Sequence, residues 1–201
     1  MRSLPRRPLL VGAALALVVA VLGGLVVAAL VDHGPKVDQR IHFTDADRDT
    51  TNTVPDGLVG PDATGDPVPT TTFVRLGGGI GRLGDYGGKP LVVNIFYETC
   101  APCVKEMPIL QQAFARLGGR VAFLGLDAED NEKEAADIVE QTGVRYDIAR
   151  DPSGTLVTKL GTAVTPTTYL VSPSGMIVDD HRGAFSSLDE LLSLVHDKLG
   201  V

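Results

Sequence analysis

The chain has 201 residues, 44% of them hydrophobic, and a formal net charge of −7. This length allows one ordinary domain with additional segments, but not two full domains. With 25 acidic and 18 basic residues, the chain lacks the excess of Lys and Arg that characterises nucleic-acid-binding surfaces, so a nucleic acid is excluded as its partner.

The N-terminal region contains a long apolar segment. Residues 9–31 carry no charged side chain, and three arginines precede them. As a helix this segment would extend about 35 Å, which is enough to cross a hydrocarbon core of about 30 Å. The preceding positive charge favours a cytoplasmic N-terminus. We therefore expect residues 1–31 to form a cytoplasmic stub and a transmembrane helix in a single-pass cell-membrane protein, with the remainder extracytoplasmic. A cleaved secretory signal is the alternative, because residues 27–29 could form a small-residue cleavage site.

Residues 32–67 differ from the rest of the chain in composition. They are rich in Asp, Thr, Pro and Gly and show no helical or strand periodicity. Such a composition predicts a flexible, acidic linker. From residue 68 onward the pattern becomes that of an α/β domain, which we expect to span residues 68–201.

The domain alternates between strand and helix signals. Apolar runs bounded by turn residues predict strands over residues 71–76, 80–83, 90–96, 121–126, 167–171 and 176–180. Apolar residues at helical spacing predict helices over residues 104–117, 129–141, 153–160 and 187–199. This order predicts an α/β fold with a central mixed sheet flanked by helices on both faces.

The two cysteines, Cys100 and Cys103, are separated only by Ala101 and Pro102. A disulfide across so short a loop would constrain little of the unfolded chain, so the spacing indicates redox chemistry. The pair follows a buried strand and begins a helix, where unpaired backbone N–H groups and the helix dipole favour a thiolate. We predict that Cys100 is the nucleophile of disulfide exchange and Cys103 the resolving thiol. A zinc site would need two more ligands at comparable spacing, so we expect no metal and no cofactor.

Further motifs surround the cysteine pair. Residues 83–90 read LGDYGGKP, residues 92–94 read VVN, residues 106–108 read EMP and residues 164–170 read VTPTTYL. Together with CAPC, these motifs make residues 68–201 resemble the thioredoxin superfamily, and specifically its membrane-anchored TlpA/ResA-like branch of extracytoplasmic thiol–disulfide oxidoreductases. The resemblance implies a thioredoxin-like fold.

The resemblance also implies roles for individual residues. It implies a cis Thr165–Pro166 peptide bond beside the dithiol, where the Thr165 backbone could pair with a substrate chain; a proline at a strand edge is the simpler alternative. It places an acid at Glu106, one turn after Cys103, where a partly buried carboxylate would exchange protons with the thiols. A surface acid is the alternative there. Asn94 occupies the position of a buried Asp in cytosolic thioredoxins, and because it cannot titrate, it indicates that Glu106 handles the protons.

The segment before the first cysteine departs from the family pattern. The family has tryptophans in this lead-in, whereas residues 96–99 read FYET and the chain has no Trp. The large apolar platform beside the nucleophile is replaced by Thr99, and Glu98 adds negative charge. We expect these differences to change the choice of partner rather than the chemistry.

These observations predict an extracytoplasmic enzyme that reduces disulfides in exported proteins, with apocytochrome c as the substrate that the resemblance implies. Such an enzyme exchanges electrons with a membrane partner, a donor or an acceptor. Pro102 removes a backbone donor at the helix start, and Glu98 and Glu106 oppose thiolate formation, so we expect a reduction potential below about −180 mV. A disulfide-forming oxidase is the alternative. Two remote alternatives fit the sequence less well. A peroxiredoxin-type peroxidase would have Pro at position 93 and Thr at position 97, where this chain has Val93 and Tyr97. A copper carrier could use His181 as a ligand, but it would have three residues between its cysteines, and this chain has two.

Overall fold

The computed structural model describes residues 60–128 and 130–201. Its elements, in chain order, are β1 (Thr72–Arg75), β2 (Ile80–Arg82), the 3₁₀ helix η2 (Leu83–Tyr86), β3 (Leu91–Phe96), α2 (Ala101–Leu117), β4 (Ala122–Asp127), α3 (Glu132–Thr142), β5 (Asp147–Arg150), α4 (Thr155–Lys159), β6 (Thr167–Val171), β7 (Ile177–Arg182) and α5 (Leu188–Leu199). Within these residues, no helix combines the length and hydrophobicity needed to span a bilayer. The apolar segment 9–31 and the expected linker up to residue 59 lie outside them.

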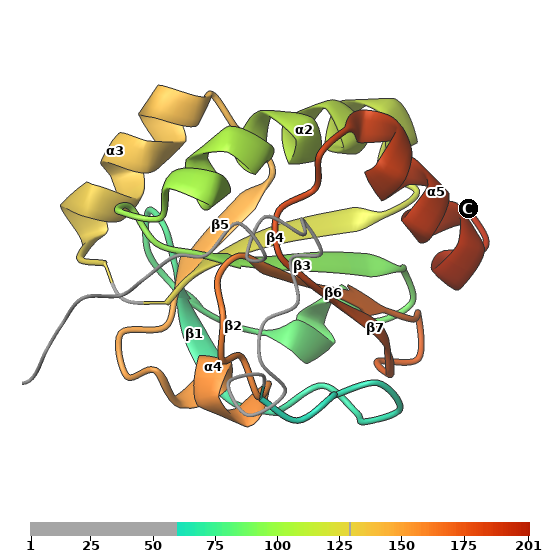
Figure 1. Cartoon of the computed structure of the whole chain (residues 1–201). Coiled ribbons are helices and arrows are strands. Elements are labelled where there is room, and N and C mark those ends of the chain that lie inside the picture. Colours follow the sequence, from blue (N-terminus) through green and yellow to red (C-terminus); the bar gives the residue numbers. More distant parts are fainter. Residues whose placement is uncertain (1–59, 129) are drawn as a thin grey trace, which may run out of the picture. The chain divides into compact units, whose positions relative to one another are not determined.

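A mixed sheet with the strand order β2-β1-β5-β4-β3-β6-β7 forms the centre of the fold (Figure 1). The neighbours β3, β4 and β5 run parallel, and the remaining pairs are antiparallel. The expected mixed sheet is therefore confirmed. β5 was not expected, because its four residues begin with Asp147 and end with Arg150 and so lack the apolar run of a central strand.

Helices cover both faces of this sheet (Figure 1). α2, α3 and α5 pack on one face, and α4 packs on the other. Every residue of β3 is buried, since its side chains alternate between two cores. Val92 and Phe96 face α2, whereas Val93 and Ile95 face α4. This double burial explains the nearly continuous apolar sequence of β3.

Helix α2 follows β3 after a short loop. Its N-cap is Cys100, so it begins three residues earlier than its apolar spacing predicts. At its C-terminal end Gly118 has a φ of 59°, a left-handed conformation that glycine adopts without a Cβ penalty. Strand β3 before it and the N-cap position that it occupies in α2 together fix Cys100 at the end of the sheet.

Residues 60–67, which we call the N-terminal strap, lie along the edge of β7. The Ile177 N–H donates to the Asp66 carbonyl at 2.9 Å, and the Arg182 guanidinium donates to the Gly60 carbonyl at 2.7 Å. The strap therefore packs on the domain, and the expectation of a flexible linker up to residue 67 is corrected for these residues. Backbone groups at the open edge of a sheet can pair with a segment of almost any composition, so the sequence carries little signal of this contact.

Candidate active site

The two cysteines form a disulfide at the start of α2. Their Cα atoms are 5.3 Å apart. Cys103 is fully buried, and Cys100 is 4% exposed. Both cysteines thus belong to the edge of the core, with Cys100 slightly the more exposed of the two.

The N-terminus of α2 provides the electrostatic environment of Cys100. Its Sγ accepts a hydrogen bond from the Cys103 N–H at 3.3 Å. In the reduced protein the same N–H and the helix dipole would stabilise a Cys100 thiolate. Pro102 lies in this first turn and contributes no N–H, which limits the stabilisation.

Glu106 lies inside the protein, directly beneath the first turn of α2. Its side chain is 0% exposed and shares the buried face of the helix with Cys103. Burial raises the pKa of Glu106 to about 7, although hydrogen bonds from Asn94 and from the backbone of Phe185 act in the opposite direction. The carboxyl group is therefore buried one helical turn from Cys103, with a pKa that lets it change protonation near neutral pH.

Two hydrogen bonds fix the orientation of the Glu106 carboxyl group. The Asn94 Nδ2 donates to Oε1 at 2.7 Å, and the Phe185 N–H donates to Oε2 at 3.1 Å. Asn94 Nδ2 also donates to the Thr168 Oγ1 at 3.0 Å. Asn94, on β3, thus connects Glu106 to β6 and supports the acid, as its sequence position suggests.

The Thr165–Pro166 peptide bond is cis. Thr167 is paired with Ile95, so these residues precede β6 at the end of the sheet where β3 leads to Cys100. Pro166 is buried and accepts a hydrogen bond from the Gly183 N–H through its carbonyl at 2.9 Å. The structure therefore places Thr165, Pro166, the disulfide and Glu106 at the same end of the sheet.

Two hollows lie on either side of the segment from Tyr97 to Ala101. One, of about 440 Å³, is lined by Glu98, Thr99, Ala101, Val104, Lys105 and Gln141. The other, of about 230 Å³, is lined by Tyr97, Ala128, Val157, Thr162, Ala163, Val164 and Thr165. Extended protein segments could lie in either, and the second hollow includes the residue expected to pair with a substrate chain.

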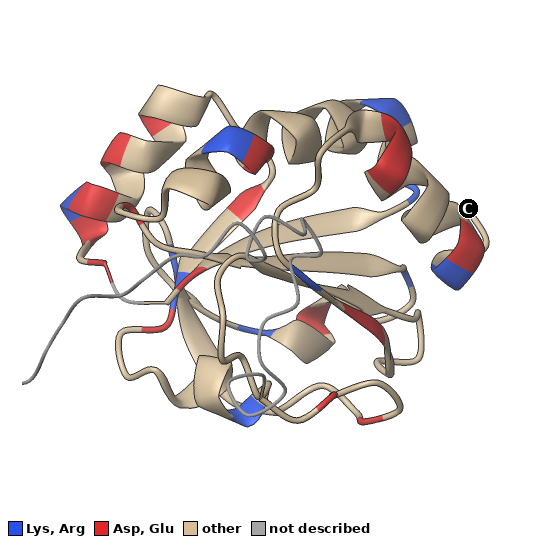
Figure 2. Ribbon diagram, viewed as in Figure 1, with Lys and Arg blue, Asp and Glu red and all other residues tan. Residues whose placement is uncertain are grey.

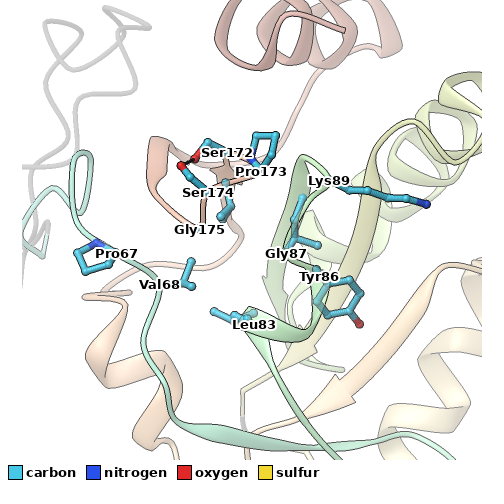
Figure 3. A pocket seen from close by; sticks show the side chains of 13 residues that line it. Pro67, Val68, Leu83, Tyr86, Gly87, Lys89, Ser172, Pro173, Ser174 and Gly175 are labelled. Atoms are coloured by element: carbon cyan, nitrogen blue, oxygen red, sulfur yellow. Dashed lines mark hydrogen bonds between the residues drawn. The ribbon is translucent and has the colours of Figure 1, made fainter.

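A further cavity lies at the opposite end of the sheet (Figure 3). It has a volume of about 270 Å³ and lies between η2, the strap and the turn that joins β6 to β7. Leu91, which begins β3, and Val171, which ends β6, line it. This cavity is separated from the disulfide by the length of β3 and does not belong to the site.

An acidic cluster includes Glu98, which precedes Cys100 by two residues in the sequence. Oxygen atoms of Glu98, Asp130 and Glu134 lie within 4.8 Å of one another. Figure 2 shows further acidic residues along α3. Within the described residues these three are the acids placed closely enough to share one hard cation, but Asp130 already accepts a hydrogen bond from the Glu98 N–H. Glu98 is the member of this cluster that brings negative charge closest to Cys100 in the sequence.

Sequence reasoning missed two members of the hydrogen-bond network around Glu106: Phe185, which donates to the carboxyl group, and Thr168, which accepts from Asn94. Thr168 could have been found from its place in the strand after Pro166, since it pairs with Asn94 across the sheet. Phe185 donates through its backbone across 79 residues of sequence, and a backbone donor leaves no signal in the sequence. A third residue, His181, stacks against Phe185 and was considered before only as a metal ligand.

A Cys-X-X-Cys disulfide that caps a helix, followed by a buried acid and accompanied by a cis proline, defines a thioredoxin-like thiol–disulfide oxidoreductase. The comparison with protein families agrees with this class. The chain belongs to the AhpC/TSA family, whose model matches residues 64–180.

Individual relatives share this chemistry by name. The chain is 26% identical over 120 residues to the thiol-disulfide oxidoreductase ResA of Bacillus thuringiensis, covering 59% of this chain and 69% of the relative. It is 32% identical over 103 residues to the thiol:disulfide interchange protein DsbE of Xylella fastidiosa, covering 51% of each. The crystal structure of a secreted disulfide oxidoreductase from Mycobacterium tuberculosis superposes with a TM-score of 0.59 at 22% identity, covering 64% of this chain and 96% of that one, which supports the fold.

Proposed function

We propose that this protein reduces disulfide bonds in exported proteins, outside the cytoplasm, through Cys100 and Cys103. The observation that carries the proposal is the fully buried Glu106, one helical turn after Cys103 and held by Asn94. A carboxyl group with a pKa of about 7 can both accept and deliver a thiol proton near neutral pH.

The proposed reaction has two exchange steps. The Cys100 thiolate attacks one sulfur of the substrate disulfide; a mixed disulfide forms and the first substrate thiolate leaves. Cys103 then loses its proton to the Glu106 carboxylate and attacks the Cys100 Sγ. The second substrate thiolate then leaves. Both substrate thiolates take up a proton: Glu106 returns the proton that it received from Cys103, and solvent supplies the other. The substrate disulfide gains two electrons, and the enzyme is left as the disulfide that the structure shows.

The substrate would bind across the end of the sheet. The Thr165 backbone lies beside the hollow next to Tyr97, so an extended polypeptide could add to this end as a short strand. Apocytochrome c fits this scheme as an exported protein whose cysteines must be reduced before haem attachment. A membrane electron donor would return the enzyme to the dithiol, because the extracytoplasmic compartment does not supply reductant.

The proposed location rests on residues 1–31. Their apolar run is long enough to anchor the chain, with residues 68–201 as the catalytic domain outside the cytoplasm. Of residues 32–67, which would connect the two, the strap is already part of the folded domain.

Disulfide formation is the second candidate. One observation favours it: the Cys103 N–H points at the Cys100 Sγ, a contact that would stabilise a reduced, thiolate form. A dithiol protein whose reduced form is very stable acts as an oxidant. Pro102 and the nearby acids oppose this effect, so we favour reduction.

Trapping of mixed disulfides tests the roles of the two thiols. The full-length Cys103→Ser variant should accumulate mixed disulfides with exported proteins through Cys100, because no resolving thiol remains. The matched Cys100→Ser variant should trap few or none, since Cys103 is fully buried. Equal yields from the two variants would contradict the assignment of Cys100 as the nucleophile.

A further inference from the structure

A row of three side chains crosses the sheet beneath Glu106. Asn94 on β3 pairs with Thr168 on β6, and Thr168 pairs with His181 on β7. Residues directly opposite each other in antiparallel strands project from the same face. All three therefore face the layer of α2 and α5. Asn94 donates to Glu106 and to Thr168, whereas the third member of the row, His181, lies opposite Thr168.

His181 instead stacks on Phe185. The two rings are 4.1 Å apart between centroids and inclined by 10°. Phe185 is the residue whose N–H donates to the Glu106 Oε2. The imidazole of His181 is thus one side chain removed from the acid, and it contacts the residue that completes the hydrogen bonding of the acid.

The segment that carries Phe185 is fixed at both ends. At its start the Gly183 N–H donates to the Pro166 carbonyl at 2.9 Å. At its end the Ser186 N–H donates to the Glu190 Oε2 at 2.8 Å, in the first turn of α5. Between these two attachments, the Phe185 ring is held by the core and by the stacked imidazole. Removal of the imidazole would leave one face of the ring unsupported.

We propose that His181 is a positioning residue for Glu106: by stacking on Phe185, it holds the backbone N–H that stabilises the ionised carboxyl group. The proposal rests on the proton-transfer role proposed above for Glu106. It adds that His181 on β7, on the far side of the neighbouring strand β6, holds one of the two hydrogen-bond donors to Glu106, and that the Phe185 segment joins the acid to Pro166.

Stacking, rather than charge, carries the effect. Burial lowers the pKa of His181, while the carboxylates of Glu190 on α5 and Asp179 on β7 act in the opposite direction. The imidazole is therefore mainly neutral at pH 7 and does not act as a cation on Glu106. Among the described residues, the Tyr146 phenol also interacts electrostatically with Glu106. Burial raises the pKa of this phenol, so the phenol stays neutral near pH 7. An aromatic ring without a titratable nitrogen should consequently support Phe185 as well as the imidazole of His181 does.

A carboxyl titration tests this proposal. The full-length oxidised protein, labelled with ¹³C in its Glu side chains, would be titrated by NMR to follow Glu106. His181→Ala should raise its pKa from about 7 to about 8, because a weakened hydrogen bond to the ionised form costs about one pH unit. His181→Phe should keep the pKa near 7. The matched control, His196→Ala, removes an exposed imidazole from α5 and should also leave it unchanged.

Two results would overturn the proposal. One is an unchanged or lowered Glu106 pKa in His181→Ala; the other is an equal rise in His181→Ala and His181→Phe, which would show that the ring stacking is irrelevant. The titration uses the oxidised protein and requires no exchange reaction. Failure of the proposed function would appear separately, as an exchange rate that Glu106→Gln does not change.

Discussion

Replacement of Glu106 by Gln should change how the stability of the protein depends on pH. Burial raises the pKa of this carboxyl group from 4.5 to about 7. The folded protein therefore binds the proton more tightly than the unfolded chain does. The corresponding stabilisation is fully present below about pH 4.5 and is lost as the pH rises through about 7, and a difference of this size corresponds to about 3 kcal/mol.

The Gln side chain is neutral throughout this range. Wild-type protein should lose about 2 kcal/mol between pH 5 and pH 8 through Glu106, and Glu106→Gln should not show this loss. The variant should also be less stable by a constant amount, because the NH2 group that replaces one carboxyl oxygen faces either the Phe185 N–H or the Asn94 Nδ2, donor against donor; this costs about 1–3 kcal/mol.

Urea unfolding of the oxidised full-length proteins in detergent, followed by circular dichroism at pH 5 and at pH 8, measures both effects. The difference between wild type and variant removes contributions from other titrating groups. Disulfide exchange should also slow at least about tenfold in the variant and lose its inflection near pH 7. If the stability of wild type and variant changed equally between pH 5 and pH 8, Glu106 would not be a buried titrating acid. If the pH profile of the exchange rate were unchanged in the variant, Glu106 would have no role in proton transfer.

Two further substitutions test the framework of the site. Gly125→Ala should destabilise the protein by about 1–3 kcal/mol in urea unfolding. The added Cβ would lie 2.7 Å from the Ile148 Cδ1 and 3.0 Å from the Phe96 Cε1. Unchanged stability would contradict this prediction and would mean that β4 can shift. Arg182→Ala removes two donors to the strap and should speed proteolysis within residues 60–67, whereas exposed Arg116→Ala should not; equal digestion of both would show that the guanidinium does not hold the strap.

The parts of the fold with strong local signals could be predicted from the sequence. The apolar run of β3, the helix that follows it and the cysteines between them are contiguous, so their arrangement depends on few long-range contacts. The 3₁₀ helix and β5 lacked such signals. β5 is held by its neighbours β4 and β1 rather than by its own composition, and Asp147 at its start argued against a strand.

The environment of Glu106 could be predicted only in outline. Its place one turn after Cys103 indicated a role, but an acid at this spacing fits a surface helix equally well. What buries it is the packing of α2 against the sheet and the Phe185 segment, which is 79 residues away in sequence. The strap was missed for a similar reason, since edge pairing uses backbone groups that every residue carries.

The direction of the reaction is the central claim, and the reduction potential of the Cys100–Cys103 pair tests it most directly. Full-length protein in detergent would be equilibrated with glutathione buffers, and its free thiols counted after alkylation. Pro102 and the acids near the disulfide should limit the stability of the thiolate, so we predict a potential well below about −180 mV, on the thioredoxin side of the known range. A value near about −120 mV would contradict the reductase and identify the protein as an oxidant.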